Sequence, residues 1–329
     1  MTWYIIAAAV VVLFTVVALA AGTGMFFNYA ILSDNYKKGR RPTNAWDEDE
    51  NRPEDVMFNA SCIPYKDEMI EVRKWIKRCE LKEFTVTSYD GLKLKARFLA
   101  PQKMRGIVLM MNGYRSNPLH DFSLAVKEFY EMGVGCMLPY QRAHGDSEGK
   151  YICFGVKERY DVVSWCELIG KEFPGVPVIL DGISMGATRV MMASGLDLPP
   201  NVKGIIADCG FTSPFDIFKS VASRFMHLRP FPFIYLTGIA ARLRAGFSLK
   251  QVYTQEELKK NRLPIFIAHG KKDNFVPYSM SEINYAAAKE VCDATFLSAP
   301  EADHGMSFLT ERGKYLKEVQ SMVDRCMPA

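Results

Sequence analysis

The hydrophobic pattern divides the chain into regions of different character. Residues 3–21 read W-Y-I-I-A-A-A-V-V-V-L-F-T-V-V-A-L-A-A, and the first charged residue is Asp34. Residues 34–56 are polar, charged and proline-containing. Farther on, short apolar runs alternate with amphipathic stretches. We therefore predict an apolar N-terminal segment (1–32), a linker (33–63) and a globular domain (64–329).

The N-terminal apolar segment has two interpretations. About 20 apolar residues suffice to cross a bilayer as a helix, whereas A-L-A at 18–20 resembles the cleavage site of a secretory signal. A signal normally begins with positive charge, but here Lys37, Lys38, Arg40 and Arg41 follow the apolar run. By the positive-inside rule, this favours a retained single-pass transmembrane anchor with the globular domain in the cytoplasm.

The globular domain reads as an α/β protein. A helix fits at 64–79, and alternating residues on both sides of Asp90-Gly91 predict a β-hairpin. The following apolar strands are expected at 106–112, 133–139, 176–182, 203–208, 264–269 and 294–299. The intervening helices are expected at 119–132, 155–172, 185–195, 278–290 and 308–325. Continuous apolar strands alternating with helices indicate a mostly parallel sheet covered on both faces.

Composition excludes several classes of protein. The chain has 329 residues, is 49% hydrophobic and carries a formal net charge of +4, which gives no reason to expect a nucleic-acid partner. The 8 cysteines include no C-x-x-C pair. We expect them to be reduced thiols of the core rather than disulfides or a metal site.

One short stretch indicates chemistry. Residues 176–190 read V-P-V-I-L-D-G-I-S-M-G-A-T-R-V, in which G-x-S-x-G joins a predicted strand to a predicted helix. Gly182 and Gly186 permit a sharp turn and close packing. Ser184 would then project from the turn as the nucleophile of a serine hydrolase.

A serine nucleophile needs a histidine base and a carboxylate that orients it. His227, His269 and His304 follow Ser184, and we favour His304 because A-D-H-G directly follows the last predicted strand. Both Asp273 and Asp208 follow strands and could reach a histidine on that final loop. For the oxyanion, the backbone N–H groups of Met185 and Tyr114 are the candidate donors.

Five motifs carry a resemblance to a known family: N-G-Y-R-S-N, R-A-H-G-D-S-E-G, G-I-S-M-G-A, H-G-K-K-D-N-F-V-P and A-D-H-G. Over about residues 80–326 the chain resembles the α/β-hydrolase superfamily. The resemblance is to the branch of serine aminopeptidase-like and monoglyceride-lipase-like enzymes, especially bacterial membrane-anchored members of unassigned substrate. It implies an α/β-hydrolase fold with a leading antiparallel hairpin and a helical lid insertion at 211–262.

The resemblance also bears on single residues. The D-x-x-V-P context of Asp273 is similar to the usual acid turn of the superfamily, which favours Asp273 over Asp208. His144, which precedes Ser184, is expected to be loop scaffolding. Two positions depart from the common pattern: Asn112 stands where many relatives have His, and Ala143 stands where R-G-H-G-x-S is usual.

These features predict a Ser184–His304–Asp273 serine hydrolase that cleaves a carboxylic ester through an acyl-enzyme, without a cofactor or metal. The lid is rich in Phe, which indicates a small-molecule ester with an apolar acyl or aryl group. Its arginines could instead contact an acidic substrate group or a lipid phosphate. An amide or peptide hydrolase and a non-catalytic membrane-tethered binding protein are the alternatives. The pattern makes no prediction of oligomeric state.

Overall fold

A computed structural model describes residues 2–36, 60–225, 227 and 229–328. One eight-stranded sheet forms the centre, in the order β1-β2-β4-β3-β5-β6-β7-β8. Its strands are β1 (Lys82–Thr87), β2 (Lys93–Leu99), β3 (Gly106–Met111), β4 (Val134–Pro139), β5 (Val178–Ile183), β6 (Val202–Asp208), β7 (Ile265–Gly270) and β8 (Ala294–Ala299). β2 pairs antiparallel with β1 and β4, and all other pairs are parallel. This is the predicted α/β-hydrolase fold with its leading hairpin.

Helices cover both faces of the sheet, as strands that are apolar on both sides require. One face packs against α3 (Lys66–Arg78), α4 (Pro118–Glu131) and α12 (Arg312–Cys326). The other packs against α5 (Glu158–Glu172), α6 (Met185–Ala193) and α10 (Tyr278–Ala288). Within β3, Val108 and Met110 belong to the first core and Ile107 and Leu109 to the second. This alternation follows from the two-residue period of a strand.

The helix expected at 308–325 is divided. A short helix, α11 (Ser307–Thr310), precedes α12, and Glu311 between them has φ −118° and ψ 33°. These angles lie outside the helical region, so the chain turns at Glu311. The break allows α11 to stay beside the loop of His304 while α12 packs on the sheet.

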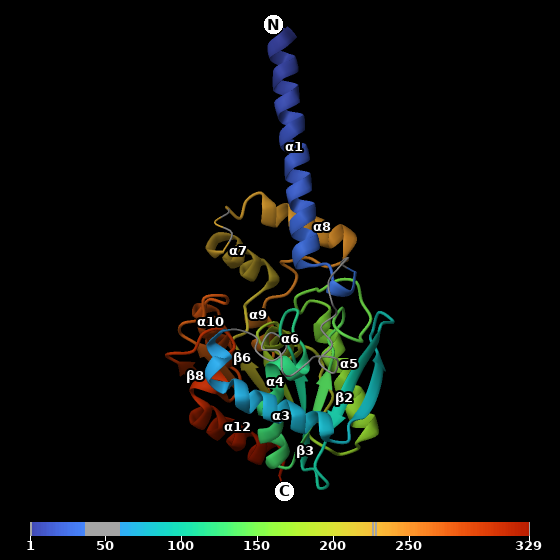
Figure 1. Cartoon of the computed structure of the whole chain (residues 1–329), viewed down its shortest axis with the longest axis vertical. Helices are drawn as coiled ribbons and strands as arrows, with labels where there is room; N and C mark the ends of the chain where they lie inside the picture. Colours follow the sequence, from blue (N-terminus) through green and yellow to red (C-terminus); the bar gives the residue numbers. More distant parts are fainter. Residues whose placement is uncertain (1, 37–59, 226, 228, 329) are drawn as a thin grey trace.

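The N-terminal helix α1 (Thr2–Ala30) projects from the body along the long axis of the molecule (Figure 1). Within Trp3–Ala30, the most apolar 18-residue window has a mean hydropathy of 2.8 and is not buried at all. The helix is long and apolar enough to span a membrane, and a signal sequence has the same properties.

The last turns of α1 are docked on the body. Phe27, Ala30 and Ile31 belong to a third hydrophobic core, which they share with the lid. Backbone hydrogen bonds then join the segment after α1 to a neighbouring loop. The Ile152 N–H donates to the Ile31 carbonyl at 2.8 Å, and the Ser33 N–H donates to the Lys150 carbonyl at 2.9 Å. The 3₁₀ turn η1 (Asp34–Tyr36) follows.

Within the described residues, the predicted lid (211–262) contains three helices. They are α7 (Pro214–Arg224), α8 (Phe233–Arg244) and α9 (Thr254–Leu258). In Figure 1, α7 and α8 flank the lower end of α1, at the opposite end of the molecule from the C-terminus.

Residues 37–59 of the predicted linker lie outside the described residues, and η2 (Ala60–Tyr65) leads into α3. All eight cysteines are free thiols, and six are buried.

Candidate active site

Ser184 occupies the turn between β5 and α6. Its backbone angles, φ 56° and ψ −117°, are costly for a residue with a side chain. The Ser184 N–H donates to the Asp208 carbonyl at 2.8 Å, which helps hold this conformation. The flanking glycines are required sterically, because a Cβ on Gly186 would lie 1.7 Å from the Met111 carbonyl oxygen and one on Gly182 would lie 2.4 Å from Gly186.

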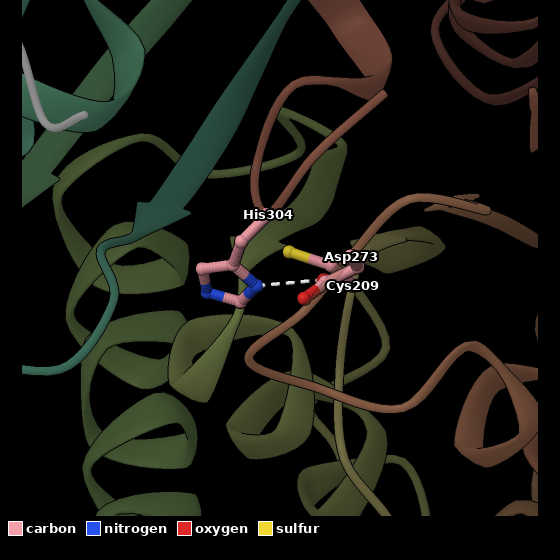
Figure 2. A group of neighbouring side chains, drawn as sticks. All are labelled: Cys209, Asp273 and His304. Carbon is pink, nitrogen blue, oxygen red and sulfur yellow. Dashed lines mark hydrogen bonds and ion pairs between the residues drawn. The ribbon is translucent and has the colours of Figure 1, made fainter. Parts of the chain in front are cut away.

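Three of the predicted residues are joined by hydrogen bonds at one edge of the sheet. His304 lies on the loop after β8, and its Nε2 is 2.9 Å from Ser184 Oγ. Its Nδ1 is 2.7 Å from Oδ2 of Asp273, which follows β7 (Figure 2). With Nδ1–H donating to the carboxylate, Nε2 is the acceptor for the serine hydroxyl. The arrangement can therefore move a proton from Ser184 to His304.

The carboxylate of Asp273 is held from several directions. Oδ1 accepts the backbone N–H groups of Phe275 and Val276, both at 2.8 Å. Oδ2 lies 3.1 Å from Nε2 of His269 as well as near His304. Burial by itself would raise the pKa of Asp273, but hydrogen bonds from His269 and His304 outweigh it and lower the pKa. Asp273 is therefore ionised.

The opposite shift affects His304. Burial disfavours its cation, but the hydrogen bond and negative charge of Asp273 prevail and raise the pKa of His304. Asp208 adds to this effect from farther away. The raised pKa means that the site stabilises the imidazolium that forms when the serine proton is transferred.

The other candidate acid and bases lie in different environments. The Asp208 carboxylate accepts the Ser307 hydroxyl at 2.8 Å, and burial raises its pKa to about 6. His269 is buried, with Nδ1 2.6 Å from Ser281 Oγ, and its Nε2 contacts the same Asp273 oxygen as His304. His227 is exposed in the lid. The position of His269 as a support for Asp273 was not anticipated, although H-G-K-K-D places the two residues four apart.

The candidate oxyanion donors also lie at this edge. Met185 is the first residue of α6, so its N–H has no partner within the helix. Tyr114 belongs to the loop after β3, and it lines a cavity of ≈ 310 Å³ together with Ser184 and His304. Met185 directly follows Ser184, which lines the same cavity.

Contacts around Tyr114 give its loop a defined shape. Asp121 at the start of α4 accepts the Gly113 N–H at 2.6 Å, and the Asn112 amide donates to the Ser116 carbonyl at 2.9 Å. His144 accepts the Arg115 N–H at 3.1 Å, and burial lowers the pKa of His144 to about 3, so it is neutral. This supports the scaffolding role expected of His144. Asp121 was not singled out from the sequence, where it stands as an ordinary first-turn acid.

Cys209 lies beside Asp273 and His304 (Figure 2). The ligand atoms of the three side chains lie within 4.8 Å of one another, and these residue types can bind metals. Burial raises the pKa of the Cys209 thiol well above its ordinary value, so the sulfur stays protonated. His304 is already engaged with Ser184 and Asp273. The cluster therefore offers proton transfer rather than a thiolate ligand.

A second, apolar pocket of ≈ 450 Å³ meets Ser184. Aromatic and aliphatic side chains dominate its lining, and they come from α1, the lid and the body. They are Phe26, Tyr29, Ala30, Tyr114, Phe154, Phe211, Ile217, Phe218, Val221, Phe225 and Phe275. The lid arginines are absent from this lining. The contribution of α1 could not be foreseen, because a transmembrane pattern does not indicate which residues contact the body.

Comparison with known proteins supports the fold. No known protein-family model matches the chain. The uncharacterized protein YqkD of Bacillus subtilis is 25% identical over 256 residues, covering 77% of this chain and 83% of YqkD. The esterase Pf2001 of Pyrococcus furiosus matches with a TM-score of 0.62 and 19% identity, over 76% of this chain and 93% of that chain. The acylaminoacyl peptidase of Pyrococcus horikoshii matches with a TM-score of 0.58 and 15% identity, over 78% of this chain and 43% of the peptidase. The chain thus has the α/β-hydrolase fold that this esterase and this peptidase share.

Proposed function

We propose that this protein is a serine hydrolase that cleaves carboxylic esters, with Ser184 as nucleophile, His304 as base and Asp273 as the orienting acid. The observation that carries the proposal is the unbroken series of hydrogen bonds from Ser184 Oγ through His304 to Asp273. The strained backbone of Ser184 is a second support, because such strain costs free energy and is found mainly at functional sites.

The mechanism follows from this geometry. Ser184 Oγ attacks the ester carbonyl carbon while its proton passes to His304 Nε2, and the N–H groups of Met185 and Tyr114 stabilise the oxyanion. Collapse breaks the bond to the alcohol oxygen, which takes the proton from His304, and an acyl-Ser184 remains. A water molecule, deprotonated by His304, then attacks the acyl carbon. The bond to Ser184 Oγ breaks, Oγ takes the proton back from His304, and the carboxylic acid is released. Removal of one oxyanion donor typically costs about 10²–10³ in kcat.

The pocket favours an ester with an apolar acyl or aryl group. Its lining beside Ser184 is aromatic and aliphatic, and the lid arginines do not contribute to it, which argues against an acidic substrate group. The likeness to an esterase agrees with this assignment. The amide or peptide hydrolase is the second candidate, because an acylaminoacyl peptidase has the same fold.

We further propose that α1 is retained as a single-pass anchor with the hydrolase domain in the cytoplasm, as in the bacterial membrane-anchored branch that the sequence resembles. Packing of Phe27, Ala30 and Ile31 on the body requires that the end of α1 be kept. Cleavage after A-L-A would still leave those residues, so packing alone does not distinguish anchor from signal. The intact mass of the membrane-extracted protein does, since cleavage would remove about 20 residues.

The test of catalysis uses the full-length chain in detergent, because α1 lines the pocket. A fluorophosphonate should label the wild type at Ser184 and leave Ser184→Ala unlabelled. Wild-type protein should then hydrolyse p-nitrophenyl esters faster than the matching p-nitroanilides. Faster anilide cleavage would favour the amide hydrolase. Absence of labelling in folded wild-type protein would favour the membrane-tethered binding protein.

A further inference from the structure

The apolar pocket beside Ser184 is completed by the N-terminal helix. Phe26, Tyr29 and Ala30 of α1 line it together with Phe218 and Val221 of α7. The rings of Phe26 and Phe218 meet edge to face, with centroids 5.6 Å apart. The pocket volume of ≈ 450 Å³ is of the size that holds a small organic ligand. Without α1, this space would be an open groove.

Polar contacts fix the end of α1 in this position. The guanidinium of Arg115 donates to the carbonyls of Tyr29 at 2.7 Å and Leu32 at 2.8 Å, and it also pairs with Asp34. The Tyr114 hydroxyl donates to the Ala30 carbonyl at 2.9 Å. The last carbonyls of a helix lack helical partners and carry partial negative charge, so a cation is well placed there. The end of α1 is therefore hydrogen-bonded directly to the loop of Tyr114 and Arg115, which lies beside Ser184.

The same helix sets the level of a bilayer relative to the pocket. Residues 2–21 span about 30 Å at about 1.5 Å per residue, which matches the hydrocarbon core of a membrane. Gly22 comes next, and a Cβ built there would lie 3.0 Å from the ring of Phe233, at the start of α8. Helix α8, which crosses the lower end of α1 in Figure 1, thus begins where α1 would leave the hydrocarbon.

The exposed face of α8 has the composition of a helix at the membrane interface. Tyr235, Ile239 and Leu243 follow each other at intervals of four residues and are 47%, 56% and 80% exposed. Arg242 and Arg244 lie beside them and are exposed as well. An apolar stripe with adjacent basic residues is typical of a helix that lies in the membrane interface.

We propose that the C-terminal turns of α1 are the acyl-binding wall of the site, and that the pocket takes the apolar chain of an amphiphilic ester resident in the bilayer. This inference rests on the proposed function of Ser184. The apolar chain of the ester reaches the pocket along α1 and beneath α8, so the apolar surface of the ester stays out of water. Phe26 and Ala30 then determine which chain lengths fit.

The test measures kcat/KM of the full-length protein on p-nitrophenyl esters of graded chain length. Ala30→Leu fills the pocket and should lower the ratio of long-chain to short-chain kcat/KM by about tenfold. Phe26→Ala enlarges the pocket and should move the preferred length upward. The control is Phe14→Ala, an aromatic of α1 that is 74% exposed and outside the pocket; it should keep the wild-type ratio. Wild-type ratios in both pocket variants would overturn the role of α1.

A second arm distinguishes the source of the ester. The protein reconstituted in phosphatidylcholine vesicles should hydrolyse a long-chain ester embedded in those vesicles faster than the same ester supplied on albumin. Equal rates would overturn delivery from the bilayer.

Failure of this inference differs from failure of the proposed function. A small fluorophosphonate reports Ser184 whatever the chain pocket does. Labelled Phe26→Ala and Ala30→Leu with unchanged chain-length ratios would reject the α1 wall alone. A wild type that is neither labelled nor hydrolytic would reject the proposed function. The pocket can then still be tested by the binding of a fluorescent fatty acid to Ser184→Ala. We expect the double variant Ser184→Ala, Ala30→Leu to bind this fatty acid more weakly. Equal binding by the two proteins would reject the wall in that case as well.

Discussion

The hydroxyl of Tyr114 donates a hydrogen bond of 2.9 Å to the backbone carbonyl of Ala30. The backbone N–H of Tyr114 is also a proposed oxyanion donor. One residue thus links the end of the N-terminal helix to the site where negative charge would develop. Because Tyr114 also lines the apolar pocket, this residue connects α1, the pocket and the loop after β3.

Removing that hydroxyl should loosen the link without removing the backbone donor. Tyr114→Phe leaves the Ala30 carbonyl without this donor, which costs about 1 kcal/mol of stability. We expect a lower melting temperature, and we expect a lower kcat because the loop that carries the Tyr114 N–H is held less firmly. Thermal unfolding and ester hydrolysis measure the two effects. Tyr130→Phe, on α4 and away from the pocket, is the matched control. Equal behaviour of the two variants would contradict the link.

The activity of the enzyme should depend on pH through His304. The base must be neutral to accept the serine proton, and Asp273 raises the pKa of His304 above its ordinary 6.5. We therefore expect kcat/KM to be low in acid and to rise with pH through a midpoint above 6.5. Asp273→Asn removes the charge, so the midpoint should fall, and maximal kcat should drop by about 10⁴-fold.

Asp208→Asn serves as the comparison for this prediction. Asp208 also raises the pKa of His304, but only as a smaller contribution than Asp273. The midpoint should therefore move less and activity should survive to a larger extent. If Asp208→Asn were the more damaging substitution, Asp208 rather than Asp273 would be the acid.

The strain at Ser184 predicts a difference between two inactive variants. Ser184→Ala and Ser184→Gly both lose the hydroxyl and its bond to His304, but only glycine adopts φ 56° without steric cost. Ser184→Gly should therefore be more stable than Ser184→Ala by about 1–2 kcal/mol. Chemical denaturation of the two proteins measures this difference, and fluorophosphonate labelling should fail in both. Equal stabilities would show that the turn is not strained.

Much of the fold follows from local patterns in the sequence. The hairpin at Asp90-Gly91 and the buried strands were predicted because a two-residue alternation or a short apolar run leaves few other structures. The turn at Ser184 was predictable for a steric reason, since Gly182 and Gly186 allow the close approach of β5, α6 and β3. These features depend on residues that are near in the chain.

The features that the sequence left open depend on residues that are far apart. Asp208 and Asp273 both follow strands at the same edge of the sheet, and only the path of the His304 loop brings the imidazole to Asp273. The role of Phe26 and Ala30 was hidden because apolar residues of a helix pack equally well against lipid or protein. Only the position of α7, together with the loops that carry Phe154 and Phe275, makes these residues part of a pocket.

The apolar face of α8 leads to a last prediction. The triple variant Tyr235→Ser, Ile239→Ser and Leu243→Ser removes the exposed side chains expected to enter the membrane interface. Each large apolar side chain gains up to about 1.5–3 kcal/mol on full burial, so partial insertion of three should matter. We expect the rate on a vesicle-embedded long-chain ester, relative to the same ester in detergent micelles, to fall several-fold. Ile63→Ser changes an isoleucine that is 61% exposed outside the lid, and it should leave the relative rate as in the wild type. An unchanged ratio in the triple variant would mean that α8 faces water, and the pocket would then receive its ester from solution.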